Sequence, residues 1–134
     1  MKQVTIFTDG ACRGNPGPGG WAAILSYGEH TREISGGVSS ETTSNRMELT
    51  AIIQGLAVLT EPCSVTVYTD SRNAVGWLAE GWRRKVSQIR EICHAIDLLV
   101  ASVGHQVQYE WVKGHNGHPL NERADTLALA AVPR

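Results

Sequence analysis

The sequence predicts an α/β domain built on a mixed sheet, with its elements in the order βββαβααβα. Three observations support this fold class: apolar residues alternate early in the chain, helical spacing begins at Ser44, and a β-branched run at residues 65–69 follows that helix. A strand that follows a helix is expected to lie parallel to an earlier strand, because the connection is a right-handed crossover. The sheet therefore has an antiparallel part and a parallel part.

The first half of the chain is expected to contain three strands and one helix. Residues 4–9 alternate as a strand, and a turn rich in glycine and proline occupies residues 14–20. Residues 21–27 and 31–38 continue as two strands of an antiparallel meander. The helix that starts at Ser44 has apolar residues at helical spacing: Leu49, Ile52, Ile53, Leu56 and Leu59.

The second half is expected to contain two strands and three helices. Residues 65–69 form the fourth strand, and Ser71 suits the N-cap of a short helix after it. A longer helix is expected over residues 86–103, and residues 106–111 alternate as the last strand. The final helix begins near Pro119, because proline favours the first helical position.

The composition is that of one globular domain spanning residues 1–134. Hydrophobic residues make up 42% of the chain and charged residues 19%, and no apolar run is long enough to span a bilayer. Without a leader-like start, the chain is expected to be cytoplasmic and to act as a monomer. Cys12, Cys63 and Cys93 lack the spacing of a zinc site or a disulfide framework. The formal net charge of −1 means that any nucleic-acid surface must be local.

Two aspartates follow similar strands. Asp9 ends the apolar segment 6–9 and Asp70 ends the apolar segment 67–70, so that each strand runs into a Thr-Asp pair. If the two strands are parallel neighbours, their carboxylates meet at the carboxyl edge of the sheet, where open α/β sheets bind ligands. Taken singly, Asp9 is more typical of a turn and Asp70 of a helix cap. The pair together favours a site.

Two further acids lie on predicted helices. Glu48 shares a helical stripe with Ile52 and Leu56, which places a carboxylate on the face that packs on the sheet. Alternatively, it is an acid whose charge the helix N-terminus favours. Asp125 lies four residues after Asn121 in the final helix and belongs either to an acidic and amide patch or to a solvated face.

The four acids together form a candidate cage of oxygen ligands for Mg²⁺ or Mn²⁺. Carboxylates that are brought close together repel each other strongly at low dielectric, so such a cluster requires bound cations. Two divalent ions can activate a water molecule and stabilise the leaving oxygen of a phosphodiester. The predicted chemistry is therefore phosphodiester hydrolysis.

Motifs spread along the whole chain resemble the bacterial type 1 ribonucleases H. They occur in the family's order at residues 7–10, 14–20, 43–48, 68–71, 111–115 and 121–125. The resemblance implies a ribonuclease H-like fold, with a five-stranded mixed sheet flanked by helices. It also implies an endonuclease that hydrolyses the RNA strand of RNA/DNA hybrids and leaves 5′-phosphate and 3′-hydroxyl ends, with two Mg²⁺ or Mn²⁺ ions bound alongside the substrate.

The resemblance also implies roles for single residues. The acids that match the family's metal site are Asp9, Glu48, Asp70 and Asp125. His115 matches a histidine on a mobile loop that assists proton transfer or product departure, a task that suits imidazole; alternatively, it is an ordinary surface residue. The residues that match positions approaching the minor groove and the RNA 2′-hydroxyls are Asn15, Ser44 and Asn45. Thr43 matches a phosphate-pocket position on the DNA strand.

The sequence departs from the family pattern in two places. Several relatives carry an amide at the position of Ser44. Long-form relatives insert a basic helix and loop after the short helix, whereas here the chain runs almost directly into the next helix. A remnant of that basic protrusion is a patch of three cations and two aromatic residues: Arg83, Arg84, Lys85, Trp77 and Trp82. Alternatively, both tryptophans pack in the core and the charges are solvated. Weaker substrate binding is expected without the protrusion.

Three other functions are alternatives to hybrid hydrolysis. A junction resolvase or an integrase core has the same fold, since fold alone does not fix function. A non-catalytic hybrid-binding module would gain little from clustered negative charge facing phosphates. An ATPase of the actin and sugar-kinase type would need a second domain to close over its nucleotide.

Overall fold

The structure, a computed structural model, describes residues 1–114 and 118–134. Within these residues five strands are present: β1 (Lys2–Cys12), β2 (Gly17–Tyr27), β3 (His30–Thr42), β4 (Cys63–Thr69) and β5 (Gln106–Trp111). The same described residues contain four helices: α1 (Ser44–Ala57), α2 (Arg72–Ala79), α3 (Ser87–Val103) and α4 (Pro119–Ala131). The predicted element order is confirmed.

The strands form one mixed sheet in the order β3-β2-β1-β4-β5. Strands β1, β2 and β3 are antiparallel neighbours, whereas β4 is parallel to both β1 and β5. In the parallel pair Thr8 lies opposite Thr69, so the next residues, Asp9 and Asp70, lie side by side where this pairing ends. The first strand was expected to end at Asp9, but β1 continues to Cys12 because it still pairs with β2. The mixed sheet and the central position of both aspartate-bearing strands are as predicted.

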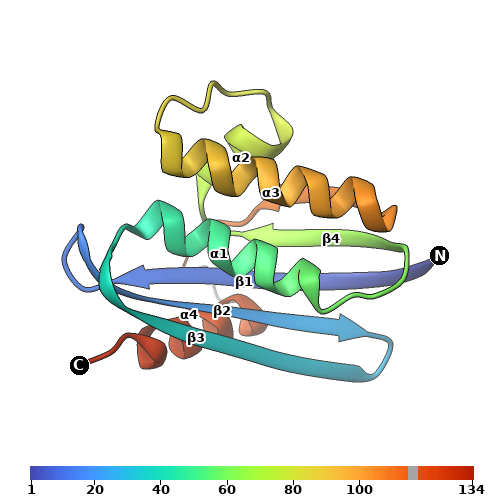
Figure 1. Cartoon of the computed structure of the whole chain (residues 1–134). Helices are drawn as coiled ribbons and strands as arrows, with labels where there is room; N and C mark the ends of the chain where they lie inside the picture. Colours follow the sequence, from blue (N-terminus) through green and yellow to red (C-terminus); the bar gives the residue numbers. More distant parts are fainter. Residues whose placement is uncertain (115–117) are drawn as a thin grey trace.

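Helices cover both faces of the sheet. In Figure 1, α1, α2 and α3 lie on one face and α4 lies on the other. The larger core fills the space beneath α1 and α3, and its fully buried residues include Ile6, Leu49, Ile52, Leu56, Val67 and Ile96. A smaller core lies under α4 and contains Phe7, Ile24 and Ala124. None of the helices in the described part of the chain could cross a membrane.

One prediction about the meander is wrong. The glycine-rich turn expected over residues 14–20 is shorter, because β2 already begins at Gly17, and β3 continues to Thr42 rather than ending at residue 38. Packing explains the difference. A β-carbon on Gly20 would lie 2.3 Å from the carbonyl oxygen of Ala128 in α4. Gly20 is therefore a strand residue that lets α4 approach the sheet backbone, rather than a turn residue.

Candidate active site

Three carboxylates converge where the parallel pairing of β1 with β4 ends. One ligand oxygen from each of Asp9, Glu48 and Asp70 lies within 4.8 Å of the others. Asp9 follows the parallel pairing of β1, Asp70 follows β4, and Glu48 reaches the same point from the second turn of α1. The structure thus brings together three of the four acids that the sequence indicated, at the carboxyl edge of the parallel strands.

A close contact between backbones places Glu48 in this cluster. A β-carbon on Gly10 would lie 2.4 Å from the main-chain nitrogen of Glu48 and 2.5 Å from the carbonyl carbon of Met47. Only glycine permits α1 to approach β1 so closely. Glu48 is 8% exposed, and its Oε2 atom has no hydrogen-bond partner among the described residues. Glu48 is thus an inward-facing carboxylate rather than an exposed acid at the helix end.

Asp125 approaches the cluster from the opposite face of the sheet. It lies in α4, and its carboxyl group makes a hydrogen-bond contact with the carboxyl group of Asp9. One turn earlier, Asn121 is 3% exposed, and its Oδ1 atom lacks a partner in the part of the chain that the structure describes. Asp9 therefore stands between Glu48 on one side and Asp125 on the other.

The cluster holds protons when no cation is present. Burial raises the pKa of Asp9 to about 8, aided by the charge of Asp70 and by the hydrogen bond with Asp125. Burial also raises the pKa of Glu48 well above its usual range, and the charges of Asp9 and Asp70 act in the same direction. Deprotonation at neutral pH therefore requires a positive charge at this place.

The donor set fits a hard divalent cation. All the converging atoms are carboxylate oxygens, which favour Mg²⁺ or Mn²⁺ over zinc or copper. The unpartnered Oε2 of Glu48 is a buried acceptor that a cation would satisfy. Both observations agree with the cation cage that the sequence indicated.

The segment after β5 closes over Asp70. Val112 donates its main-chain N–H to the carbonyl of Thr69 at 2.8 Å, and the indole N–H of Trp111 donates to the carbonyl of Asp70 at 3.2 Å. A β-carbon on Gly114 would lie 3.0 Å from Oδ2 of Asp70. His115, the predicted proton-transfer residue, lies outside the described residues.

The N-terminus of α1 carries a set of oriented hydrogen-bond donors. Thr43 is its N-cap, and its hydroxyl oxygen accepts from the main-chain N–H of Arg46 at 3.3 Å. Oδ1 of Asn15 accepts from the main-chain N–H of Ser44 at 3.1 Å. Among the described residues, no acceptor faces the hydroxyl hydrogen of Thr43 or the amide hydrogens of Asn15, so these donors are available to a ligand.

Asn45 extends this donor set towards α2. Its Oδ1 atom accepts a hydrogen bond of 3.3 Å from the side-chain amide of Asn73. This bond orients the amide group of Asn45, whose own N–H donors have no partner within residues 1–114 and 118–134. Asn73 thus orients the amide of Asn45, just as the main-chain N–H of Ser44 orients the amide of Asn15. The sequence pattern gave no signal for the role of Asn73.

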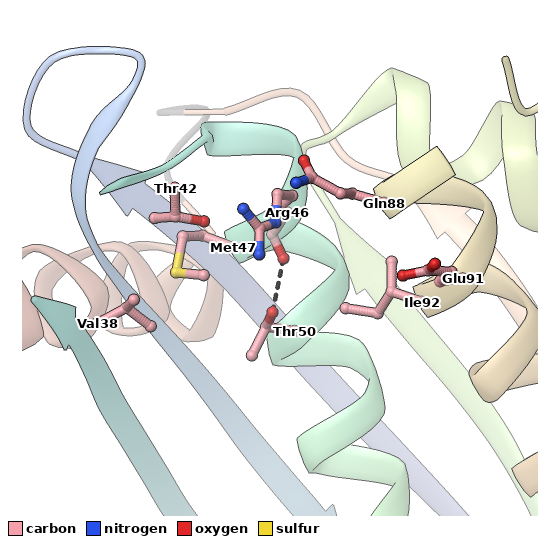
Figure 2. A pocket seen from close by; sticks show the side chains of 8 residues that line it. All are labelled: Val38, Thr42, Arg46, Met47, Thr50, Gln88, Glu91 and Ile92. Carbon is pink, nitrogen blue, oxygen red and sulfur yellow. Dashed lines mark hydrogen bonds between the residues drawn. The ribbon is translucent and has the colours of Figure 1, made fainter. Parts of the chain in front are cut away.

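A cavity lies beside this helix end. Figure 2 shows the cavity, of about 400 Å³, with Arg46 of α1 and Gln88 of α3 at its upper edge. A second cavity, of about 250 Å³, is lined by the same two residues together with Asn15, Thr43 and Asn45. Arg46 and Gln88 therefore border the donor set. The sequence did not single them out, because only the packing of α3 against α1 brings them there.

The predicted basic patch separates into two parts. Arg84 serves the fold: it donates to the carbonyl of Trp77 at 2.9 Å and to Asp97 of α3 at 2.9 Å. Trp77 packs against the larger core, which agrees with the alternative reading of this residue. Arg83 and Lys85 are exposed. The patch at the surface is thus smaller than the sequence suggested.

Trp82 is partly exposed and partly packed against α2. It is 41% exposed, its ring covers Gly76, and the guanidinium of Arg72 lies 5.1 Å from the ring centroid. Residues 80–86, which connect α2 to α3 and are all described by the structure, contain no helix.

Comparisons with known proteins agree with this site. A family profile described as RNase H matches residues 1–132. The chain is 52% identical over 143 residues to a ribonuclease H of Erythrobacter litoralis (strain HTCC2594), covering 98% of this chain and 97% of that protein. It is 49% identical over 145 residues to a ribonuclease H of Polaromonas sp. (strain JS666 / ATCC BAA-500), covering 100% of this chain and 91% of that protein.

Two solved structures are also similar. The N-terminal RNase H domain of rv2228c from Mycobacterium tuberculosis, a fusion with maltose binding protein, has a TM-score of 0.85 and 29% identity, covering 98% of this chain and 94% of that one. LC11-RNase H1 in complex with an RNA/DNA hybrid has a TM-score of 0.84 and 27% identity, covering 96% of each chain.

Proposed function

Because this chain belongs to the ribonuclease H family, and is accordingly an endonuclease that degrades RNA in RNA/DNA hybrids, we propose that its active site is formed by four acids: Asp9, Glu48, Asp70 and Asp125. The observation that carries this proposal is the convergence of three of these carboxylates within 4.8 Å. The contact between Asp125 and Asp9 adds the fourth. We propose that residues 1–134 form one domain that acts as a monomer.

The family implies a divalent metal, and the proposed ions are Mg²⁺ or Mn²⁺, two with substrate present. When bound, such ions activate a water molecule and stabilise the leaving oxygen. The protein supplies the ligands: Asp9 and Glu48 lose the proton that burial holds on them and become oxygen donors. Asp70 and Asp125 approach from different elements and so fix the cluster on two sides.

Proton transfer at the leaving group is assigned to His115. This assignment rests on the family motif at residues 111–115, and an imidazole titrates in the range that proton transfer at neutral pH requires. The proposed products carry 5′-phosphate and 3′-hydroxyl ends, because the oxygen of the attacking water bonds to phosphorus, the bond from phosphorus to the ribose 3′-oxygen breaks, and that 3′-oxygen takes up a proton.

The donors at the start of α1 fit the two strands of a hybrid. The free amide hydrogens of Asn15 and Asn45 suit the acceptor atoms of base edges and 2′-hydroxyls in a minor groove. Ser44 lies between them on the same helix end. The hydroxyl hydrogen of Thr43 suits a phosphate oxygen of the DNA strand. Recognition of the 2′-hydroxyl would distinguish RNA from DNA.

A smaller basic surface is proposed to weaken substrate binding. The short connection at residues 80–86 is assigned to the place of the basic protrusion of long-form relatives. Arg83 and Lys85 are its exposed cations and are proposed to contact phosphates, with Trp82 offering an exposed ring edge. Arg84 and Trp77 contribute indirectly, since Arg84 bonds to Trp77 and fixes the path of this connection.

The experiment compares labelled RNA/DNA hybrid, double-stranded DNA and double-stranded RNA, each with Mg²⁺, Mn²⁺ or a chelator. We expect cleavage of the hybrid's RNA strand alone, lost with chelator and lost in Asp9→Asn and Asp70→Asn. Glu29→Gln, an exposed residue in the β2–β3 turn, serves as the control for charge removal. Equal cutting of duplex DNA would favour a resolvase-like nuclease, and tight hybrid binding without cleavage would favour a binding module.

A further inference from the structure

Trp111 connects the end of β5 to the main chain of an active-site acid. Its indole Nε1 donates a hydrogen bond of 3.2 Å to the carbonyl oxygen of Asp70. The two residues lie 41 positions apart in the chain, so this bond joins two separate segments. Trp111 is also 49% exposed, which is unusual for a large aromatic side chain and indicates that it does not serve mainly to fill the core.

The carbonyl of Asp70 lies between two regular hydrogen-bond ladders. The parallel pairing of β4 with β5 continues through the bond from Val112 to the carbonyl of Thr69 at 2.8 Å. The ladder of α2 begins at the carbonyl of Ser71, which accepts from Val75 at 3.3 Å. Asp70 is therefore the residue at which the chain changes from strand to helix. The indole bond holds the main chain at that change of direction.

The bond also links Asp70 to the segment that closes over the site. Trp111 starts the run that leads to Gly114, whose absent side chain lets the backbone approach the carboxylate of Asp70. One end of this segment is thus tied to the carbonyl of Asp70, while its glycine packs against the side chain of the same residue. A change in the indole bond would alter both the direction of the carboxylate and the position of the segment.

We propose that Trp111 is a positioning residue, whose indole N–H fixes the Asp70 main chain so that the Asp70 carboxylate keeps its place beside Asp9 and Glu48. This inference rests on the function proposed above for that cluster. Sites of this kind tolerate displacements of only about 0.5 Å before activity falls. A hydrogen bond at a half-exposed position adds little to global stability, so its effect falls on the site rather than on the fold.

The chemistry of the ring offers a matched set of variants. Trp111→Phe keeps an aromatic ring but removes the donor. Trp111→His keeps a donor, because Nε2 of histidine occupies the ring position that corresponds to Nε1 of tryptophan. Trp21→Phe is the control: it removes an indole N–H from a half-buried tryptophan in β2 whose ring lies against Gly36.

In hybrid cleavage we expect Trp111→Phe to lower kcat roughly three- to tenfold, the effect of one hydrogen bond, with KM changed less than about twofold. Trp111→His should recover at least half of the loss on a logarithmic scale, and Trp21→Phe should match the unmodified protein. Wild-type kcat in Trp111→Phe, a change confined to KM, or a Trp111→His variant as impaired as Trp111→Phe would each overturn the proposal. A wild-type protein that does not cut hybrid would instead contradict the proposed function.

A second readout needs no activity. The protein has four tryptophans, so a ¹⁵N spectrum shows four indole N–H signals, and Trp111→Phe identifies the one from Trp111. In metal-free protein this signal should exchange with water more slowly than expected for a half-exposed indole. It should shift on addition of Mg²⁺ in the unmodified protein but not in Asp70→Asn. An indole that exchanges freely and ignores Mg²⁺ would overturn the proposal even if every variant folded.

Discussion

Removing the charge of Asp9 is expected to stabilise the metal-free protein. In the folded state the pKa of Asp9 is about 8, compared with 3.8 for an unperturbed aspartate. Between these values the folded protein holds a proton that the unfolded chain has released, so stability falls as the pH rises through this window. The slope is about 1.4 kcal/mol for each pH unit for one such proton. Above the folded-state pKa the penalty is complete.

The size of the effect follows from this window. A full shift from 3.8 to about 8 corresponds to a penalty of roughly 5–6 kcal/mol. Asp9 contacts the carboxyls of both Glu48 and Asp125, and these two acids remain buried when Asp9 is replaced. We therefore expect Asp9→Asn to raise the free energy of unfolding by less than the full penalty, by about 2–3 kcal/mol. Asp9→Asn should therefore be more stable than the unmodified protein near pH 8 in chelator, with the difference shrinking towards pH 4.

Urea denaturation in chelator at several pH values measures this difference, and the experiment is repeated with saturating Mg²⁺. Bound cation should reverse the order, because it stabilises only the protein that retains the carboxylate. Glu29→Gln, which removes an exposed acid, should follow the unmodified protein at every pH. If Asp9→Asn in chelator is equal to or less stable than the unmodified protein near pH 8, the inferred cost of charging the buried Asp9 carboxyl is refuted.

Four other substitutions test three separate features of the structure. Gly10→Ala should cost roughly 2–4 kcal/mol in urea denaturation and lower kcat, because its methyl group would push α1 and Glu48 away from β1; unchanged stability would contradict this close contact. Asn15→Asp keeps the acceptor for Ser44 but replaces the free donors by a negative charge, so KM for hybrid should rise at least about tenfold with little change in melting temperature; an unchanged KM would exclude Asn15 from the substrate surface. Arg84→Ala should lower stability by about 1–2 kcal/mol, whereas Arg83→Ala should leave stability unchanged and reduce the salt dependence of hybrid binding by about one phosphate contact; the opposite pattern would reverse these assignments.

The sequence predicted the acidic cluster because its geometry follows from topology. Asp9 and Asp70 each follow an apolar segment, and the parallel pairing of two neighbouring strands brings such residues together where it ends. Glu48 was recognisable because it interrupts an apolar helical stripe. These inferences need only periodicity and the rules of strand connection.

Other features depend on contacts that periodicity does not encode. Gly17 and Gly20 looked like turn residues, since a strand glycine and a turn glycine differ only in what packs against them. The part played by Arg84 was hidden for the same reason: its partners, Trp77 and Asp97, become neighbours only when α3 packs beside α2. The free donors of Asn15 and Asn45 likewise depend on which oxygen is already occupied.

Calorimetric titration of the metal-free protein with Mg²⁺ at pH 7, in two buffers of different ionisation enthalpy, most directly tests whether a cation replaces the protons that the clustered carboxylates hold. The account predicts binding that releases protons, because the raised pKa values of Asp9 and Glu48 both fall when the cation arrives, and a smaller release in Asp9→Asn, in which Glu48 alone of these two can lose a proton. Binding without proton release, or binding that Asp9→Asn leaves unaltered, would contradict it.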